Sequence, residues 1–262
     1  MLGGLLLSLI AAIVTLSAPV QASEEDWDVV VDPARRLTTA SIAYSSGQSI
    51  IVACRAGDLN VIVRGLDPDA GLSRYAEVTV DQLHPDAQNW FNLGDGAAVL
   101  SGTPAFHARR FRTGGVLEFG VGPSGLHPRA TKRFALDLPD GFEGVDQVLT
   151  ACGVPLSDPR DSISRWNSFA FPGDTVWTRM ARPEYPEAAA AAGIETGFAV
   201  SSCIVGPQGE PLECRVEKES DPRAGFGNAA VRSLRSARVV LGGEGGATPG
   251  QVMVATMRFR VE

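Results

Sequence analysis

Residues 198–219, FAVSSCIVGPQGEPLECRVEKE, have the clearest structural pattern in the C-terminal part of the chain. Two strand-like runs, Phe198–Val205 and Leu212–Glu219, flank a Gly-Pro-Gln-Gly turn, which is the pattern of a β-hairpin. Cys203 and Cys214 lie on either side of this turn. In an antiparallel hairpin they would face each other within reach of a disulfide.

The residues around this hairpin predict a helix on each side and a final strand. Tyr185 and Pro186 open the first helix, Ala188–Ala192 favour it, and Gly193 ends it. After the hairpin, apolar residues recur at helical spacing: Phe226, Ala230, Val231, Leu234 and Ala237. Residues 251–261 alternate as a long strand. The order helix, hairpin, helix, strand predicts a compact α+β unit.

This order resembles the C-terminal domain of TonB-type periplasmic energy transducers, over residues 178–262. The positions that carry the resemblance are Tyr185, Pro186, Gly193, Gly209, Phe226 and Ala230. The chain departs from the family pattern at Arg238–Gly243, where the family has a basic-aromatic-proline motif. It also has a β-rich segment where the family has a Pro-Lys-rich spacer. The resemblance implies a non-enzymatic protein that contacts an outer-membrane transporter or transport complex.

The resemblance also implies where the partner binds. In the family, a short receptor segment adds as an extra strand to the last strand, because an edge strand offers unpaired N–H and C=O groups. The corresponding residues are Val252, Met253, Val254, Ala255, Thr256, Met257, Arg258 and Phe259. The alternative is that the other domain, or a second copy in a homodimer, covers this edge.

Residues 23–155 predict an antiparallel β domain, a sandwich or barrel-like fold closed by one helix. The strand-like runs are Ile50–Cys54, Leu59–Val63, Tyr75–Val80, Ala97–Leu100, Ala105–Phe111 and Val116–Val121. Helical spacing within Asp140–Cys152 predicts the closing helix, and residues 156–177 read as a linker. The domain is similar, through its Trp-Asp-Val start and strand layout, to exported modules of the invasion-associated type.

The four cysteines and the first segment indicate export. An even set of cysteines favours two disulfides in an oxidising compartment. A bond from Cys54 to Cys152 would close a long loop and restrict the unfolded chain by about 4 to 5 kcal/mol. Residues 1–22 predict a signal peptide, cleaved after Ala22, and a periplasmic protein. An uncleaved inner-membrane anchor is the alternative, since the uncharged run Leu2–Val20 could just cross a bilayer.

Composition and motifs argue against several other functions. The chain is 44% hydrophobic and has a net charge of −7, which is typical of a globular protein that does not bind nucleic acid. Gly120–Gly125 matches G-x-G-x-x-G, but the Leu-His-Pro that follows favours a β-turn over a cofactor loop. Three histidines lie far apart in the sequence: His84, His107 and His127. No cysteine has the spacing of a zinc ligand. We therefore predict no catalytic residue, no metal and no small-molecule cofactor.

Two functions remain open from the sequence. The first is a periplasmic interaction protein that pairs its last strand with a partner. The second is an exported adaptor whose β domain binds an envelope component without energy transduction. An exported hydrolase is a weaker rival, because the sequence has no G-x-S-x-G elbow and no metal pattern.

Overall fold

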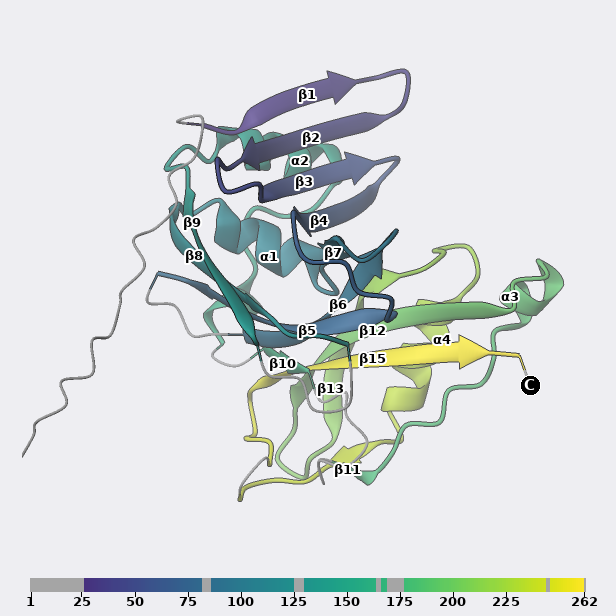
Figure 1. Ribbon diagram of the computed structural model, residues 1–262. Helices are drawn as coiled ribbons and strands as arrows, with labels where there is room; N and C mark the ends of the chain where they lie inside the picture. The colour runs from purple at the N-terminus through teal and green to yellow at the C-terminus, as the bar shows by residue number, and fades with distance from the viewer. Residues whose placement is uncertain are drawn as a thin grey trace, which may run out of the picture.

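The computed structural model describes residues 26–81, 86–124, 130–163, 166–168, 177–243 and 246–261, with only the backbone course for 166–168. The predicted signal peptide, His84 and His127 lie outside these ranges. Within them, no helix combines the length and apolar character that a membrane span requires. The fold is α+β, as predicted (Figure 1).

Nine antiparallel strands form the N-terminal part. They are β1 (Asp28–Asp32), β2 (Leu37–Ala43), β3 (Ser49–Arg55), β4 (Asp58–Arg64), β5 (Ser73–Val80), β6 (Asp86–Leu93), β7 (Ala98–Leu100), β8 (Gly115–Val121) and β9 (Lys132–Leu138). The path β1-β2-β3-β4-β7-β6 continues from strand to strand, while β5, β8 and β9 branch from β6. Neither end of this ladder pairs with the other among the described strands, so no closed barrel forms.

Two helices cover this sheet, one more than predicted. α2 (Glu143–Ala151) is the expected closing helix. The predicted strand Ala105–Phe111 is wrong, because this segment forms α1 (Pro104–Phe111). A proline at the first helical position favours the helix. Seven of the eight residues of α1 are buried. A helix enclosed on every side has no exposed polar face, so its sequence lacks the usual amphipathic period.

The disulfide between Cys54 and Cys152 joins α2 to the centre of the sheet. Cys54 lies near the end of β3, and Cys152 is the C-cap of α2. Their Cα atoms are 5.5 Å apart, and the bond closes a sequence separation of 98 residues. The predicted pairing is therefore confirmed.

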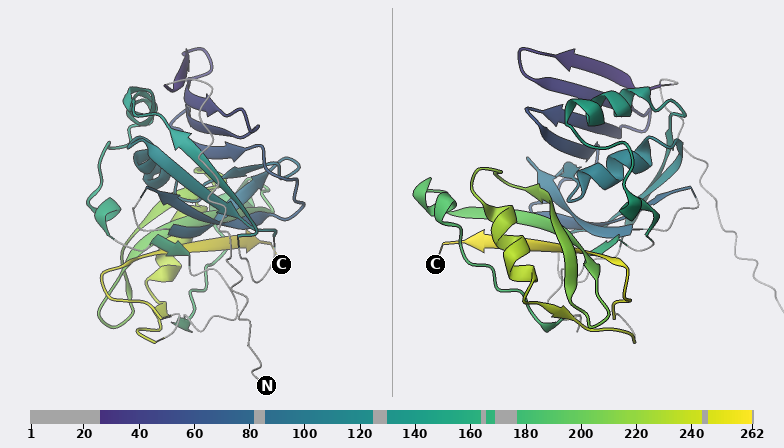
Figure 2. Two further views of the ribbon diagram at one scale, coloured as in Figure 1. Left: turned by 60° about the vertical axis from the view of Figure 1, so that its left-hand side comes forward. Right: turned by 180° about the vertical axis from the view of Figure 1, so that it is seen from behind.

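The C-terminal part has the predicted order of helix, hairpin, helix and strand. Its elements are α3 (Glu187–Ala191), β12 (Thr196–Val205), β13 (Pro211–Glu219), α4 (Phe226–Leu234) and β15 (Val252–Arg260). The strands lie in the order β13-β12-β15, with β12 antiparallel to both neighbours. A separate two-stranded sheet joins β11 (Trp177–Arg179) to β14 (Arg238–Val239). Seen from behind, α4 lies in front of the three strands (Figure 2).

The hairpin disulfide depends on a β-bulge. The register of β12 against β13 shifts by one residue between Ser202 and Ile204. Glu213 has a left-handed φ of 47°, which marks the extra residue on β13. The bulge brings Cys214 to Cys203, and the two form the second disulfide. The pairing is as predicted, whereas nothing in the turn sequence indicated the bulge.

The face of the C-terminal sheet opposite α4 packs on the N-terminal part. Their shared apolar core contains Phe91, Leu100, Phe106, Val200, Val252 and Val254. Between the two parts lie the short helix η1 (Pro159–Ser162) and strand β10 (Trp166–Ser168), within the predicted linker. β10 pairs in parallel with both β6 and β15, so the described strands of both parts, apart from β11 and β14, belong to one connected sheet.

Candidate protein-interaction site

The predicted recognition strand β15 is paired along its whole length on one side only. Its contacts with β12 run from Val252 opposite Ile204 to Arg260 opposite Thr196. On the other side, β10 pairs with residues 252–254. Beyond residue 254, no further strand among the described residues pairs with this side of β15. Residues 255–260 therefore present backbone groups of the kind that a strand partner binds.

The two faces of β15 have different neighbours. Met253, Ala255, Met257 and Phe259 belong to clusters that pack beneath α4. Val252 and Val254 instead join the core shared with the N-terminal part. This alternation follows from the two-residue side-chain period of a strand. Six of the eight predicted site residues thus hold the strand in place from both faces, and the backbone edge beyond residue 254 pairs with no described strand.

The side chain of Arg258 is the exposed exception on this strand's N-terminal-facing side. Its Nη2 donates to Ser73 Oγ of β5 at 2.8 Å. Thr256 lies between Arg258 and the buried valines and is half-buried.

The residues that carry the family resemblance are structural. Tyr185 packs edge-on against Phe226 at 5.9 Å between ring centroids, and Phe226 lies 5.0 Å from the ring of Phe259. The Tyr185 hydroxyl donates to the carbonyl of Ile194, which follows the glycine that ends α3. Gly193 has a φ of 67°. These contacts fasten both helices to the sheet.

Gly209 and Ala230 complete this set. Gly209 has a φ of 75°, and a Cβ there would collide with the carbonyl oxygen of Val239. Ala230 is fully buried on α4. Pro186, just before α3, is the N-cap of that helix rather than its first residue.

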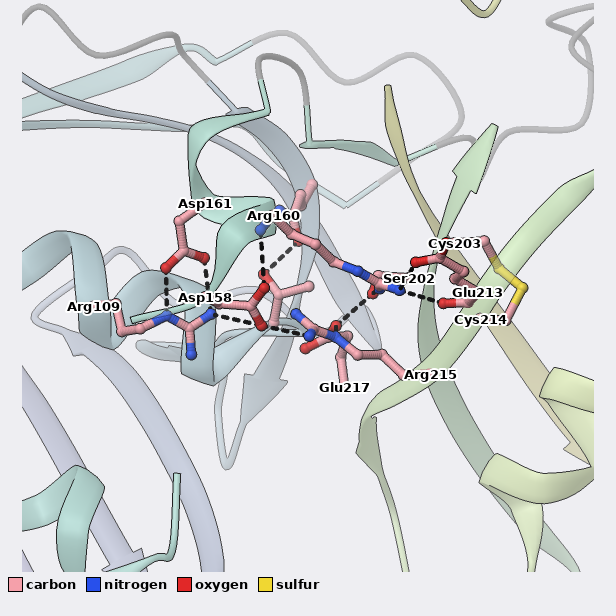
Figure 3. Close-up of polar contacts among 12 residues, drawn as sticks. Arg109, Asp158, Arg160, Asp161, Ser202, Cys203, Glu213, Cys214, Arg215 and Glu217 are labelled. Carbon is pink, nitrogen blue, oxygen red and sulfur yellow. Dashed lines mark hydrogen bonds and ion pairs between the residues drawn. A yellow bond between two sulfur atoms is a disulfide. The ribbon is translucent and has the colours of Figure 1, made fainter. Parts of the chain in front are cut away.

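An ionic network fixes the C-terminal hairpin to the N-terminal part (Figure 3). Arg109 on α1 binds Asp161 through two hydrogen bonds of 2.5 and 2.8 Å. Asp158, at the N-cap of η1, accepts a hydrogen bond from Arg215 on β13. Arg215 also donates to Glu217 at 2.7 Å. The network therefore runs from α1 through η1 to β13.

Charge and hydrogen bonding set the pKa values within this network. Partial burial raises the pKa of Asp158, but the Arg160 backbone N–H and the Arg215 guanidinium more than offset this, so its pKa lies below the ordinary value. For Arg215, burial lowers the pKa, and Glu217 and Asp158 together raise it above the ordinary value. Both groups are therefore held in their charged forms.

Lys218 makes a second polar contact between the two parts. Its ammonium is buried and donates to Asp58, to Asn60 Oδ1 at 3.0 Å and to the Leu59 carbonyl at 3.3 Å. All three acceptors lie on β4, so one side chain of β13 binds directly to a strand of the N-terminal sheet.

A serine, a histidine and an aspartate meet inside the N-terminal part. Ser101 Oγ lies 2.6 Å from His107 Nδ1, and His107 Nε2 lies 2.9 Å from Asp86 Oδ2. Arg110 Nη1 donates to the other oxygen of Asp86 at 2.8 Å. The exposed fractions of Ser101, His107 and Asp86 are 0%, 0% and 1%. A substrate could not reach this serine, so the arrangement acts as a buried hydrogen-bond network.

The hydrogen-bond partners of His107 have no signal in the sequence. The residues lie on β6, after β7 and on α1, and only the fold brings them together. Across the described ranges, no group of three or more His, Cys, Asp or Glu side chains is positioned to hold a metal ion.

Comparison with known families identifies the C-terminal part. Residues 181–261 match the family model described as the Gram-negative bacterial TonB protein C-terminal. This segment is a TonB C-terminal domain. No curated protein matches the chain. TonB C-terminal domains are interaction and transducer domains that contact other proteins of the envelope, which agrees with an envelope location.

The TonB C-terminal domain here is joined to a neighbour that covers much of it. α4 lies on one face of its sheet, and the N-terminal part lies on the other. β13 forms the far edge of this sheet among the described strands, and the backbone edge on residues 255–260 of β15 is the candidate interaction site that the sequence predicted.

Proposed function

We propose that this protein binds an outer-membrane transporter or transport complex by adding a partner strand to β15. The observation that carries the proposal is the edge at residues 255–260, which pairs with β12 on one side and with no described strand on the other. β10 already pairs in parallel with residues 252–254, which supports the capacity of this edge to accept a strand in that orientation. The TonB C-terminal domain supports a protein partner.

The proposal includes export to the periplasm, with the signal peptide cleaved after Ala22, and no catalytic activity. The two disulfides support an oxidising compartment. An intact mass that begins at Ser23 is expected. A mass that includes Met1 in the membrane fraction would instead indicate an inner-membrane anchor.

Photo-crosslinking in cells tests the partner directly. A benzoylphenylalanine at Thr256, in the middle of the open edge, should crosslink to an outer-membrane protein that mass spectrometry identifies. The matched control places the same group at Arg235, which is exposed at the end of α4. Equal crosslinking from both positions, or none from Thr256, would contradict the proposal.

A second candidate function is the adaptor in which the N-terminal domain binds the envelope component. It is favoured by β1, which among the described strands pairs only with β2 and which exposes Val30 and Val31 by 49% and 57%. The same crosslinking group can be placed at Val30. Crosslinking to an envelope component from Val30, together with none from Thr256, would favour this alternative.

A further inference from the structure

A groove between the N-terminal part and the start of the C-terminal sheet is a candidate for an additional site. Its volume is about 840 Å³, within the range of pockets that hold small molecules. Its apolar wall includes Leu72, Phe91, Leu93, Phe198, Phe259 and Val261. The rings of Phe91 and Phe198, one from each part, stack at 4.1 Å and continue the shared core to the floor of the groove.

Large apolar side chains remain exposed at the mouth of the groove. Leu72 is 72% exposed and Val261 is 50% exposed. These side chains leave apolar surface in contact with water, beside a groove that continues into the core. A ligand in the groove could cover this surface.

Two cations lie on the same rim. Arg258 and Arg260 both line the groove and are exposed. Among the described residues neither guanidinium forms an ion pair, and Arg258 donates only to the neutral Ser73. Glu195 is the one carboxylate among the described lining residues, so the rim carries a net positive charge.

Two further polar side chains of the groove, those of Asn92 and Ser220, already have hydrogen-bond partners. Asn92 accepts from Arg74 and donates to Asp69 and Gly71. Ser220 Oγ accepts from the backbone N–H of Phe198. A peptide lying on the apolar floor, away from the backbone edge of β15, would bury amide groups that find few partners, which is costly. A hydrocarbon chain carries no such penalty.

We propose that the groove binds a fatty acid, with its chain along the aromatic floor and its carboxylate at Arg258 and Arg260. Guanidinium groups pair with carboxylates through two parallel hydrogen bonds, which orients the head group. The apolar floor selects for chain length rather than for a particular chemical pattern. This site goes beyond the partner-binding edge, because it uses the face of the sheet and the side chains of β6.

Calorimetric titration of the full-length protein with decanoate, dodecanoate and 1-dodecanol tests the site. Affinity should rise about fourfold for each added methylene, as burial of hydrocarbon requires. Dodecanoate should bind at least tenfold more tightly than 1-dodecanol. The double variant R258Q/R260Q should bring the two ligands to equal affinity, whereas R35Q, at an exposed arginine of the β1–β2 turn, should leave their ratio unchanged.

A variant that does not disturb the core separates binding from folding. Leu72→Glu changes an exposed side chain, so the thermal transition should stay unchanged while dodecanoate binding weakens at least tenfold. The proposal is overturned if dodecanoate does not bind, if its affinity is unaffected in R258Q/R260Q, or if an acidic apolar octapeptide occupies the groove in preference to the fatty acid.

Discussion

Single side chains in this protein show how burial changes the role of a residue type. Ser101, His107 and Asp86 have the chemistry of a hydrolase, but each is buried and each already has a partner. In such a setting the groups stabilise the fold, because an unpaired buried polar group costs about 1 to 3 kcal/mol.

His107→Ala should therefore lower the free energy of unfolding by about 2 to 4 kcal/mol, since it leaves both Ser101 and Asp86 without their histidine contact. Urea denaturation measures this change. The control Ser236→Ala alters an exposed hydroxyl and should change stability by less than about 0.5 kcal/mol. Equal stability of the His107 variant and the wild type would contradict the buried-network interpretation.

Asp158 gives a pH-dependent test of the ionic network. Its pKa is lowered in the folded state, so its contribution is present above the ordinary aspartate value of about 3.9 and is lost as pH falls through the lower, folded-state pKa. The stability difference between wild type and Asp158→Asn should be constant from pH 7 to 5 and shrink below pH 4. Urea titrations at each pH measure it, and a gap that does not depend on pH would contradict the assignment.

Among the secondary-structure elements, those with a clear period were predictable from the sequence. The hairpin, α4 and β15 have regular alternation or helical spacing, and the turn glycines mark their ends. Strands β1, β2, β6 and β9 were not among the predicted strands. Helix α1 was mistaken for a strand because it is buried on all sides. The bulge at Glu213 has no sequence signal, since a single extra residue leaves the composition unchanged.

The turn glycine of the hairpin offers a matched pair of variants. Gly209→Ala should destabilise the protein by more than about 1 kcal/mol. An alanine there would be strained by the left-handed φ, and its Cβ would collide with the carbonyl oxygen of Val239. Gly243→Ala has nearly the same φ, 73°, with nothing within 4 Å of the added Cβ, so it should cost about 1 kcal/mol or less. Thermal denaturation compares them, and a larger loss at Gly243 would contradict the close-contact argument.

The whole molecule differs from an isolated TonB C-terminal domain in having one sheet face covered by a second folded part. The sequence indicated two units and a linker, but it could not show that they share a core. That core uses alternate residues of strands that are far apart in the chain. For the same reason the docking network and the apolar groove had no sequence signal.

The only two lysines test the docking of the two parts. Lys218→Ala should lower the free energy of unfolding by about 2 to 3 kcal/mol, because its buried ammonium has three acceptors on the N-terminal sheet. Lys132→Ala removes an exposed pair with Asp67 and should cost less than about 1 kcal/mol. Chemical denaturation compares the two variants, and equal effects would contradict a structural docking role for Lys218.

Among the described strands, none pairs with the outer side of β15 beyond residue 254, and the proposed addition of a partner strand depends on this open edge. Residue-resolved hydrogen exchange of the free protein by NMR tests this most directly, since amides that point to an unpaired edge exchange faster than those paired within the sheet. We expect alternate amides in residues 255–260 to exchange quickly while those of 252–254, between β10 and β12, stay protected. Uniform protection of residues 255–260 would show that the edge is already covered and would contradict the account.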